Sequence, residues 1–256
     1  MNINVFLPCR KGSQRVPNKN TKKFGGAKYG LLEIKLNQLL KAKYIDKIFI
    51  SSDDEIVLNF ADKLKNPKIS IHQRDAYLAS NQATADDLIS HAYNLIQNGI
   101  ILWTHVTSPF FDNTEYDKAI LKYQDCLKNG YDSLMSVTAL KGFFWYENKP
   151  INYDRNTIKW PPTQDTMPLY EINSAVFIAD SQIYKTKKDR IGQKPFLFET
   201  DKIKSIDIDW KEDFIMADIL YKTLIKKDKE MYRGGVAALN NPKYAPQQDV
   251  CLRGAI

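Results

Sequence analysis

A basic loop follows the first apolar run of the chain and carries its strongest chemical signal. The loop holds Arg10, Arg15 and Lys19, together with Gly12 and Ser13. Arginine and lysine neutralise phosphate oxygens, glycine lets backbone amides approach a ligand, and serine adds a donor. The pattern is neither GxxxxGK[ST] nor GxGxxG, which disfavours a P-loop ATPase and a Rossmann dehydrogenase. We expect the loop to hold a triphosphate; the alternative is a solvated basic loop.

An acid pair lies much later in the chain, in the sequence Ser205-Ile206-Asp207-Ile208-Asp209. Its alternation predicts a strand in which both aspartates share one face and both isoleucines enter the core. Two carboxylates about 6 to 7 Å apart on one strand face can hold a single Mg²⁺. The alternative is a solvent-facing strand edge. The phosphate loop favours the metal, because enzymes that bind polyphosphates usually need a hard divalent ion.

Short apolar runs and helical stripes alternate along the chain and predict the elements that position these residues. We expect strands over residues 3–7, 48–50, 69–71, 100–106, 134–137, 175–179 and 203–208, and helices over 31–40, 56–64, 86–97, 116–127 and 213–225. This order predicts an α/β fold of three layers, a mostly parallel sheet with helices on both faces. In such sheets the loop after the first strand lies where ligands bind, which agrees with the basic loop.

Residues 141–169 interrupt the alternation with aromatic residues and prolines. We expect an inserted hairpin arm there that joins two copies of the chain, because large rigid rings bury much area at little entropic cost. The alternatives are a lid over the site and a satellite core.

Composition limits the class of protein. The chain has 256 residues, 43% hydrophobic and 26% charged, and 37 Lys and Arg against 30 Asp and Glu give a net charge of +7. This charge suits a phosphate-bearing substrate, nucleic acid or a membrane surface without choosing among them. The basic loop has no interleaved aromatic residue, which disfavours nucleic acid. Three cysteines without a CxxC pair argue against disulfides or a thiolate zinc site. No signal-peptide core and no run of roughly 18 apolar residues are present, so we expect a soluble cytoplasmic protein without a membrane partner.

Several motifs, taken in order over about residues 4–220, resemble those of the acylneuraminate cytidylyltransferase family. The family's opening motif, A-R-x-G-S-x-x-x-P-x-K-N, is matched by Arg10, Gly12, Ser13, Pro17, Lys19 and Asn20, with Cys9 in the alanine position. Further matches are Ser51-Ser52-Asp53, Arg74 with Leu78-Ala79-Ser80, Thr107-Ser108-Pro109, Asn173 with the strand after it, and the acid pair.

The resemblance implies a Rossmann-like nucleotidyltransferase domain. We expect this domain over residues 1–225 and a C-terminal tail, rich in Lys, Gly, Asn and Pro, over 226–256, and the aromatic arm predicts a homodimer. The resemblance also implies Mg²⁺-dependent transfer of CMP from CTP to the hydroxyl of a sialic acid-like sugar, with release of pyrophosphate. The implied catalytic residues are Arg10, Lys19 and Asp209, and the implied metal ligands are Asp207 and Asp209. The implied nucleotide-binding residues are Arg10, Gly12, Ser13, Arg15, Lys19, Asn20, Arg74, Ala83 and Thr84. The implied acceptor-binding residues are His105, Thr107, Ser108, Gln164 and Asn173.

The departures from the family pattern fall on the acceptor side. His105 stands where the family commonly has glutamine, and Gln164 lies in a stretch without the arginine that holds the acceptor carboxylate in relatives. Glu171 also replaces an arginine. An octulosonic acid, a diamino-nonulosonic acid or a phosphonate therefore stays open as acceptor, and so does a non-catalytic nucleotide-binding protein. Thr84 can equally be an ordinary helix cap.

Overall fold

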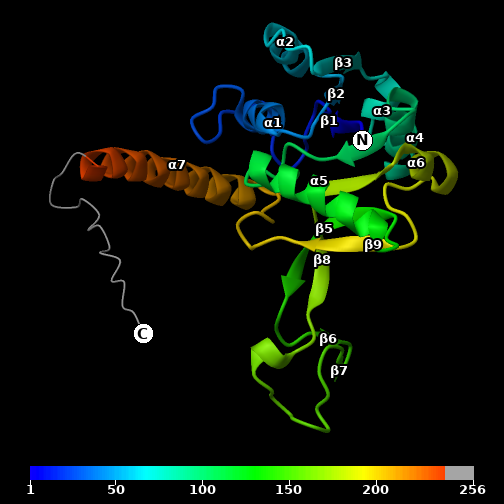
Figure 1. Ribbon diagram of the computed structural model, residues 1–256, viewed down its shortest axis with the longest axis vertical. Coiled ribbons are helices and arrows are strands. Elements are labelled where there is room, and N and C mark those ends of the chain that lie inside the picture. The colour runs from blue at the N-terminus through cyan, green and yellow to red at the C-terminus, as the bar shows by residue number, and fades with distance from the viewer. Residues whose placement is uncertain (240–256) are drawn as a thin grey trace, which may run out of the picture.

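A seven-stranded sheet forms the centre of the molecule, in the order β3-β2-β1-β4-β8-β5-β9 (Figure 1). The computed structural model describes residues 1–239, and the side chains of residues 1–225. The strands are β1 (Ile3–Pro8), β2 (Lys47–Ser52), β3 (Ile69–Gln73), β4 (Ile100–Trp103), β5 (Ser133–Leu140), β8 (Leu169–Asp180) and β9 (Pro195–Glu199). Within this sheet β8 runs antiparallel to both of its neighbours, and the other neighbouring strands pair in parallel. The predicted mostly parallel sheet is confirmed.

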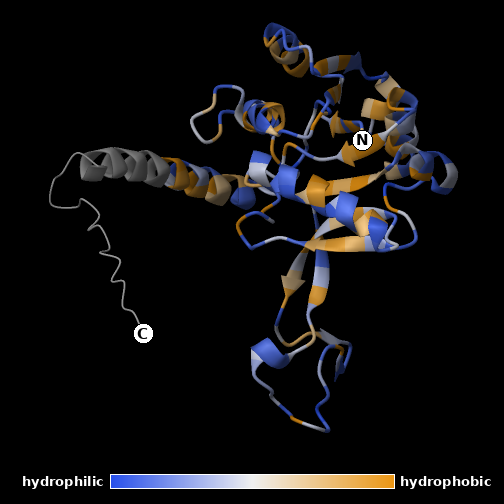
Figure 2. Ribbon diagram, in the orientation of Figure 1, coloured by the Kyte–Doolittle hydropathy of each residue, from blue (hydrophilic) through white to orange (hydrophobic). Residues whose placement is uncertain are grey.

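Helices pack against both faces of the sheet. They are α1 (Gly30–Lys41), α2 (Glu55–Lys63), α3 (Ala76–Ala79), α4 (Ala85–Leu95), α5 (Asn113–Lys128), α6 (Ser181–Lys187) and α7 (Lys211–Leu239). Val5 and Leu7 of β1 belong to an apolar cluster with α1, α2, α5 and α7, whereas Phe6 belongs to a second cluster with α4 and α6. Successive side chains of β1 thus enter opposite cores, which is why Val5, Phe6 and Leu7 are all apolar. Figure 2 shows that the strands of the central sheet are largely hydrophobic. The predicted three layers, a sheet with helices on both faces, are confirmed.

The arm grows out of two strands of the central sheet. β5 and β8 continue beyond the body as an antiparallel ribbon that ends at the pair Leu140 and Leu169. Residues 141–168 form its tip, which projects away from the body in Figure 1 and contains β6 (Trp145–Tyr146), β7 (Lys149–Pro150) and η1 (Thr163–Asp165). The buried Asn152 organises this tip, since its side-chain amide donates to the carbonyls of Gly142 at 2.8 Å and Met167 at 2.9 Å. The inserted arm is therefore a folded unit.

Two expected elements differ from the structure. Residues 203–208 form no strand: a turn over 202–205 leads into an extended segment, and the backbone amide of Ile208 donates to the carbonyl of Thr107 at 2.9 Å. The sheet edge beside β5 is instead occupied by β9, which the sequence analysis missed. The last helix also covers Lys211–Leu239 rather than 213–225, so part of the predicted tail over 226–256 is helical, and residues 240–256 lie outside the described part.

Candidate active site

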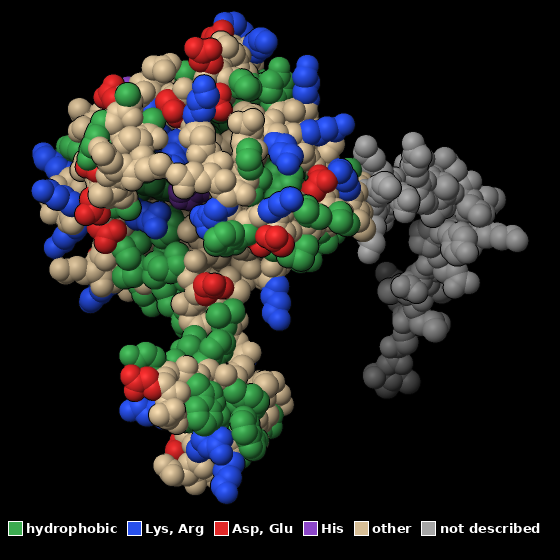
Figure 3. Space-filling view, turned by 180° about the vertical axis from the view of Figure 1, so that it is seen from behind, with side chains coloured by type: hydrophobic (Ala, Val, Ile, Leu, Met, Phe, Trp, Pro, Cys, Tyr) green, Lys and Arg blue, Asp and Glu red, His purple; other side chains and the backbone are tan. Residues whose placement is uncertain are grey.

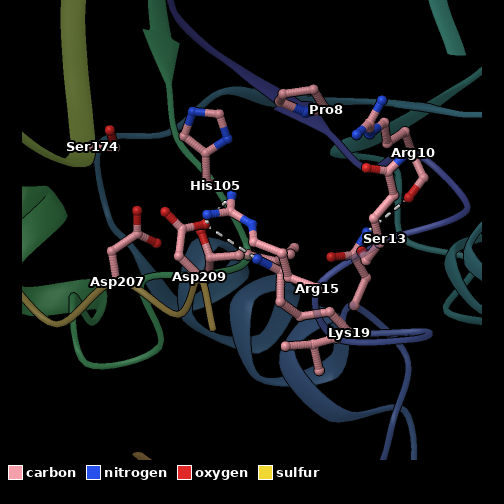
Figure 4. Close-up of a pocket in the computed structure, with 14 residues that line it drawn as sticks. Pro8, Arg10, Ser13, Arg15, Lys19, His105, Ser174, Asp207 and Asp209 are labelled. Atoms are coloured by element: carbon pink, nitrogen blue, oxygen red, sulfur yellow. Dashed lines mark hydrogen bonds and ion pairs between the residues drawn. The ribbon is translucent and has the colours of Figure 1, made fainter. Parts of the chain in front are cut away.

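A cavity of about 380 Å³ opens at the carboxyl ends of β1 and β4 (Figure 4). It is lined by Pro8, Arg10, Ser13, Gln14, Arg15, Val16, Lys19, Asn20, His105, Val106, Thr107, Ser174, Asp207 and Asp209. The basic loop and the acid pair therefore meet in one place, although nearly the whole domain separates them in the sequence. In Figure 4, Arg15 and Lys19 reach toward Asp209, while Arg10 and Ser13 lie on the far side of the opening from Asp207.

The basic loop is held in shape by contacts within itself. Val16 is buried beneath it, and the side-chain amide of Asn20 donates to the carbonyl of Arg10 at 3.1 Å, which ties the two ends of the loop together. Gly12 adopts a φ of 77°, a left-handed conformation that favours glycine. It does not line the cavity, so its role is to turn the chain. The loop thus presents its cations in fixed positions before any ligand arrives.

Arg15 and Lys19 both contact the same carboxylate. Nη2 of Arg15 lies 3.2 Å from Oδ1 of Asp209, and Nζ of Lys19 lies 3.5 Å from the same oxygen. Lys19 also donates to the carbonyl of Ile208 at 2.5 Å, and the guanidinium of Arg15 lies 4.8 Å from the ring centre of Trp210. The Arg15–Asp209 pair is half-exposed and contributes at most about 1 kcal/mol, whereas the side chain of Lys19 is largely buried. An incoming phosphate can therefore take Arg15 from Asp209 at little cost.

Asp207 has an unsatisfied oxygen. Its Oδ1 is buried and has no hydrogen-bond partner in the part of the chain whose side chains are described. Burial raises the pKa of this carboxyl, and the charge of Asp209 acts in the same direction, while Thr107 and Lys19 lower it. The fully buried Ile208 anchors the segment between the two acids. A buried carboxylate oxygen without a partner is costly unless a cation satisfies it.

These residues fit a magnesium ion. No group of three or more His, Cys, Asp or Glu suited to a metal occurs among the described residues. Asp207 and Asp209 would therefore share the ion with substrate phosphates and water. Mg²⁺ is commonly held in this manner, because it keeps several waters and needs only one or two carboxylates.

An irregularity in β8 shapes the wall opposite the basic loop. The pairing of β5 and β8 shifts register at this point, and Ser174 adopts a φ of 57°. The freed backbone groups are satisfied by side chains: Thr104 donates to the carbonyl of Ala175 at 2.7 Å, and Ser136 accepts from the amide of Val176 at 2.9 Å. A bulge of this kind re-aims the chain next to a site. It brings Ser174 to the cavity, a residue that the sequence analysis did not select.

A buried lysine supports the loop that follows β4. Nζ of Lys35 donates to the carbonyls of Ser108 at 2.8 Å and Phe111 at 3.0 Å, and to the hydroxyl of Tyr116 at 2.8 Å. The hydroxyl of Tyr116 in turn lies 2.6 Å from that of Thr104, which connects the network to the bulge. Burial lowers the pKa of Lys35 to about 7. Its place in the helical stripe of α1 gave no sign of this role.

His105 faces the cavity in one protonation state. Nε1 of Trp103 donates to Nε2 of His105 at 2.9 Å, so Nε2 is an acceptor and the proton of the neutral ring lies on Nδ1. Burial lowers the pKa of His105 to about 3, and the positive charge of Arg190 is the next largest cause. Figure 4 shows the ring beside the opening. His105 is therefore a fixed hydrogen-bond donor on this wall.

Comparison with known proteins agrees with this geometry. The family model described as cytidylyltransferase matches residues 5–231. The chain belongs to this family. The N-acylneuraminate cytidylyltransferase of Streptococcus agalactiae serotype III (strain NEM316) is 25% identical to it over 92% of this chain, and the match spans only 58% of that relative. The pseudaminic acid cytidylyltransferase of Campylobacter jejuni serotype O:2 is 25% identical over 85% of this chain and 95% of its own length. The resemblance drawn from the motifs is confirmed.

Solved structures confirm the fold of this cytidylyltransferase. A CMP:2-keto-3-deoxy-manno-octonic acid synthetase complexed with CTP superimposes with a TM-score of 0.60 at 11% identity, over 89% of this chain and 100% of the other. A 4-diphosphocytidyl-2C-methyl-D-erythritol synthase from Anaerococcus prevotii also reaches 0.60, at 16% identity, over 86% of this chain and 95% of the other. In addition, no helix among the described residues is long and apolar enough to cross a membrane.

Four of the predicted nucleotide-binding residues lie beyond the cavity lining: Gly12 in the turn of the basic loop, and Arg74, Ala83 and Thr84. Arg74 is buried, and its guanidinium donates to Oγ of Ser51 at 3.1 Å and to the carbonyl of Ser51 at 2.7 Å. Thr84 caps α4 in a capping box with Asp87, and Ala83 precedes this cap. The segment is nevertheless connected to the site, because Nη1 of Arg10 donates to the side chain of Asn81 at 3.1 Å.

Three of the predicted acceptor-binding residues also do not line the cavity. Ser108 is fully buried. The side-chain amide of Asn173 donates to the hydroxyls of Thr138 at 3.1 Å and Thr200 at 2.6 Å, which makes it a joint beneath the bulge. Gln164 is exposed in the arm, away from the body of its own chain. The wall opposite the basic loop is instead lined by His105, Thr107 and Ser174.

Proposed function

We propose that this chain transfers CMP from CTP to the hydroxyl of an acidic, sialic acid-like sugar in a Mg²⁺-dependent reaction that releases pyrophosphate. One observation carries the proposal: Arg15 and Lys19 converge on Asp209 beside the unpaired oxygen of Asp207, in a cavity wide enough for phosphates. The names of the relatives, which refer to N-acylneuraminate and pseudaminic acid, support an acidic sugar as acceptor.

The side chains of the basic loop bind and align the triphosphate. Arg10, Arg15 and Lys19 neutralise its oxygens, and Ser13 donates a hydrogen bond, so that two anionic reactants can approach each other. The acceptor oxygen attacks the α-phosphorus and its hydroxyl proton passes to water, while the bond to the bridging oxygen of the β-phosphate breaks and pyrophosphate leaves with those electrons. No protein nucleophile takes part. Asp207 and Asp209 would hold Mg²⁺, which would supply additional neutralisation of the phosphate oxygens.

The opposite wall orients the acceptor. His105 offers its Nδ1 proton to an acceptor oxygen, and the hydroxyls of Thr107 and Ser174 add further hydrogen bonds. This wall is formed by residues after β4 and by the bulge of β8, on the side of the cavity away from Arg10. Its polar groups suit a hydroxylated sugar rather than an apolar acceptor.

We further propose that two copies of the chain associate through their arms. Tyr146, Trp160 and Met167 expose 64%, 62% and 65% of their surfaces there. Figure 3 shows the arm as a concentration of hydrophobic side chains next to a mixed, charged body. Exposed apolar groups in such density are typical of an interface. In the dimer, Gln164 would reach the site of the partner subunit rather than its own.

A substrate panel tests the proposed function. The full chain is incubated with CTP, Mg²⁺ and either N-acetylneuraminic acid, pseudaminic acid or 2-keto-3-deoxy-manno-octonic acid, and pyrophosphate release is followed. We expect release with at least one acid, loss of release with excess chelator, and a CMP conjugate of matching mass. Reactions with ATP, GTP and UTP serve as controls. Binding of CTP without any release would favour the non-catalytic alternative, and absence of CTP binding would overturn the proposal.

A further inference from the structure

An arginine outside the cavity lining is stacked on aromatic rings without a polar partner. The guanidinium carbon of Arg190 lies 3.9 Å from the ring centre of Phe177 and 5.5 Å from that of Trp103. No hydrogen bond or ion pair involves this guanidinium within the part of the chain whose side chains are described. Aromatic rings attract the cationic group but accept no ordinary hydrogen bonds from it, so its N–H donors stay unused.

The position of Arg190 connects it to the acceptor wall. Phe177 of β8 pairs with Trp103 of β4, and it lies three positions after Ser174, which lines the cavity. Trp103 in turn donates to His105. Among charged groups, Arg190 contributes most to the lowered pKa of the His105 imidazole, ahead of Lys19. The guanidinium therefore lies on the His105 side of the site, whereas the cations expected to bind CTP come from the basic loop.

We propose that Arg190 binds the carboxylate of the acceptor sugar. The inference rests on the proposed function, in which the acceptor is an acid that needs a counter-charge of its own. A guanidinium packed against aromatic rings keeps its donors as a fork, and this geometry matches a carboxylate. Partial burial makes the unpaired charge costly in the free chain, and an incoming carboxylate removes this cost. A phosphate of CTP has similar chemistry, so the experiment separates the two anions.

The test compares Arg190→Met, which keeps the packing on Phe177 but removes the charge, with Arg190→Lys and a matched control. Lys122→Met is the control, because Lys122 also lies over a ring, at 4.8 Å from the centre of Phe196, but on α5. With the acid that the wild type uses, R190M should raise the acceptor KM about tenfold to a hundredfold, the usual loss for a charged pair. The KM for CTP should stay within about threefold, R190K should be intermediate, and K122M should match the wild type.

A binding measurement identifies the group that Arg190 recognises. Each acid of the panel and its methyl ester are titrated calorimetrically onto the chain loaded with CDP and Mg²⁺. The wild type should bind the acid more tightly than the ester, and R190M should bind both equally. A rise in the KM for CTP alone would assign Arg190 to the nucleotide and overturn the inference. A lower melting temperature with unchanged acceptor KM would show a purely structural role. If the wild type and R190M prefer the acid over its ester to the same degree, the inference is overturned, while turnover still supports the proposed function. If no acid of the panel binds, the inference and the proposed function are both overturned.

Discussion

The two walls of the cavity are built in different ways. On the nucleotide wall the cations are tied to the protein itself, as Arg10 is to Asn20 and Asn81, and Arg15 to Asp209. On the opposite wall the bulge of β8 shapes the surface, Arg190 lies outside the lining against Phe177, and the arm with Gln164 extends away from the body. The difference follows from the ligands: every nucleoside triphosphate has the same phosphates, whereas sugar acids differ in shape. A local, self-supporting loop suffices for the first, and variable, long-range features suit the second.

The acid pair lies between the two walls, and its removal should have the largest effect. We expect Asp209→Asn to lower turnover by about a thousandfold or more, because the charge that holds Mg²⁺ at the transferred phosphate is lost. CTP should still bind, since Arg15 and Lys19 are released from Asp209. Initial rates of pyrophosphate release and calorimetry with CTP check both expectations. Asp62→Asn, at an exposed carboxylate paired with Lys65, is the control, and unchanged turnover in D209N would contradict the metal assignment.

The arm tests whether the acceptor wall depends on a second copy. Trp160→Asp places a charge among exposed rings and should weaken the dimer by about a hundredfold or more, as expected for loss of an aromatic anchor. Sedimentation across a range of protein concentrations measures the change. If the partner subunit completes the acceptor wall, dissociation of the dimer should raise the KM for the acceptor and leave the KM for CTP unchanged. A dimer of unaltered strength would place the interface elsewhere.

Arg15→Met should change the binding of CTP and leave the binding of the acceptor nearly unchanged. Loss of one charged contact to phosphate should raise the KM for CTP about tenfold to thirtyfold and leave the acceptor KM nearly unchanged. Steady-state rates with each substrate varied in turn provide the measurement, and Lys11→Met, in the same loop but outside the cavity lining, is the comparison. An equal rise in both constants would mean that the two walls are not independent.

The smallest effect concerns the pH dependence of stability on the acceptor wall. The pKa of His105 is about 3 in the folded chain, below its ordinary value of 6.5. Below pH 6.5 the unfolded chain therefore takes up a proton that the folded chain refuses, and stability falls as the pH drops toward 3. Between pH 7 and pH 5 the wild type should lose about 1 to 2 kcal/mol more than His105→Gln. Denaturant unfolding at both pH values tests this, and parallel losses would refute it.

The regular elements of the fold could be predicted because burial determines their pattern. β1 is apolar from Val5 to Leu7 since both faces are covered, and α4 shows its stripe and its cap at Thr84 in the sequence. The sequence could not show that β8 runs antiparallel to its neighbours, because an apolar run fits a strand of either direction. The acid pair had the alternation of a strand, but Ile208 bonds to the loop after β4 instead of a sheet edge. Tertiary contacts decided that segment.

The residues of the candidate site also fall into two groups, those with a local sequence signal and those placed by tertiary contacts. Arg10, Arg15 and Lys19 could be selected because their spacing within one short loop brings them together wherever the loop lies. Ser174 and Arg190 could not, since their positions depend on a bulge and on rings contributed by β4 and β8. Lys35 lay hidden in an amphipathic stripe, where a lysine ordinarily faces water. Residues that act through distant partners leave no local signature.

The contact between Arg15 and Trp210 gives the molecule an optical signal of its own. The indole lies beneath a guanidinium that the triphosphate is expected to attract, so nucleotide arrival alters the electric field around a fluorophore. Emission from this ring would follow occupancy in real time without any label, and a Trp210→Phe chain would separate its contribution from that of the other indoles.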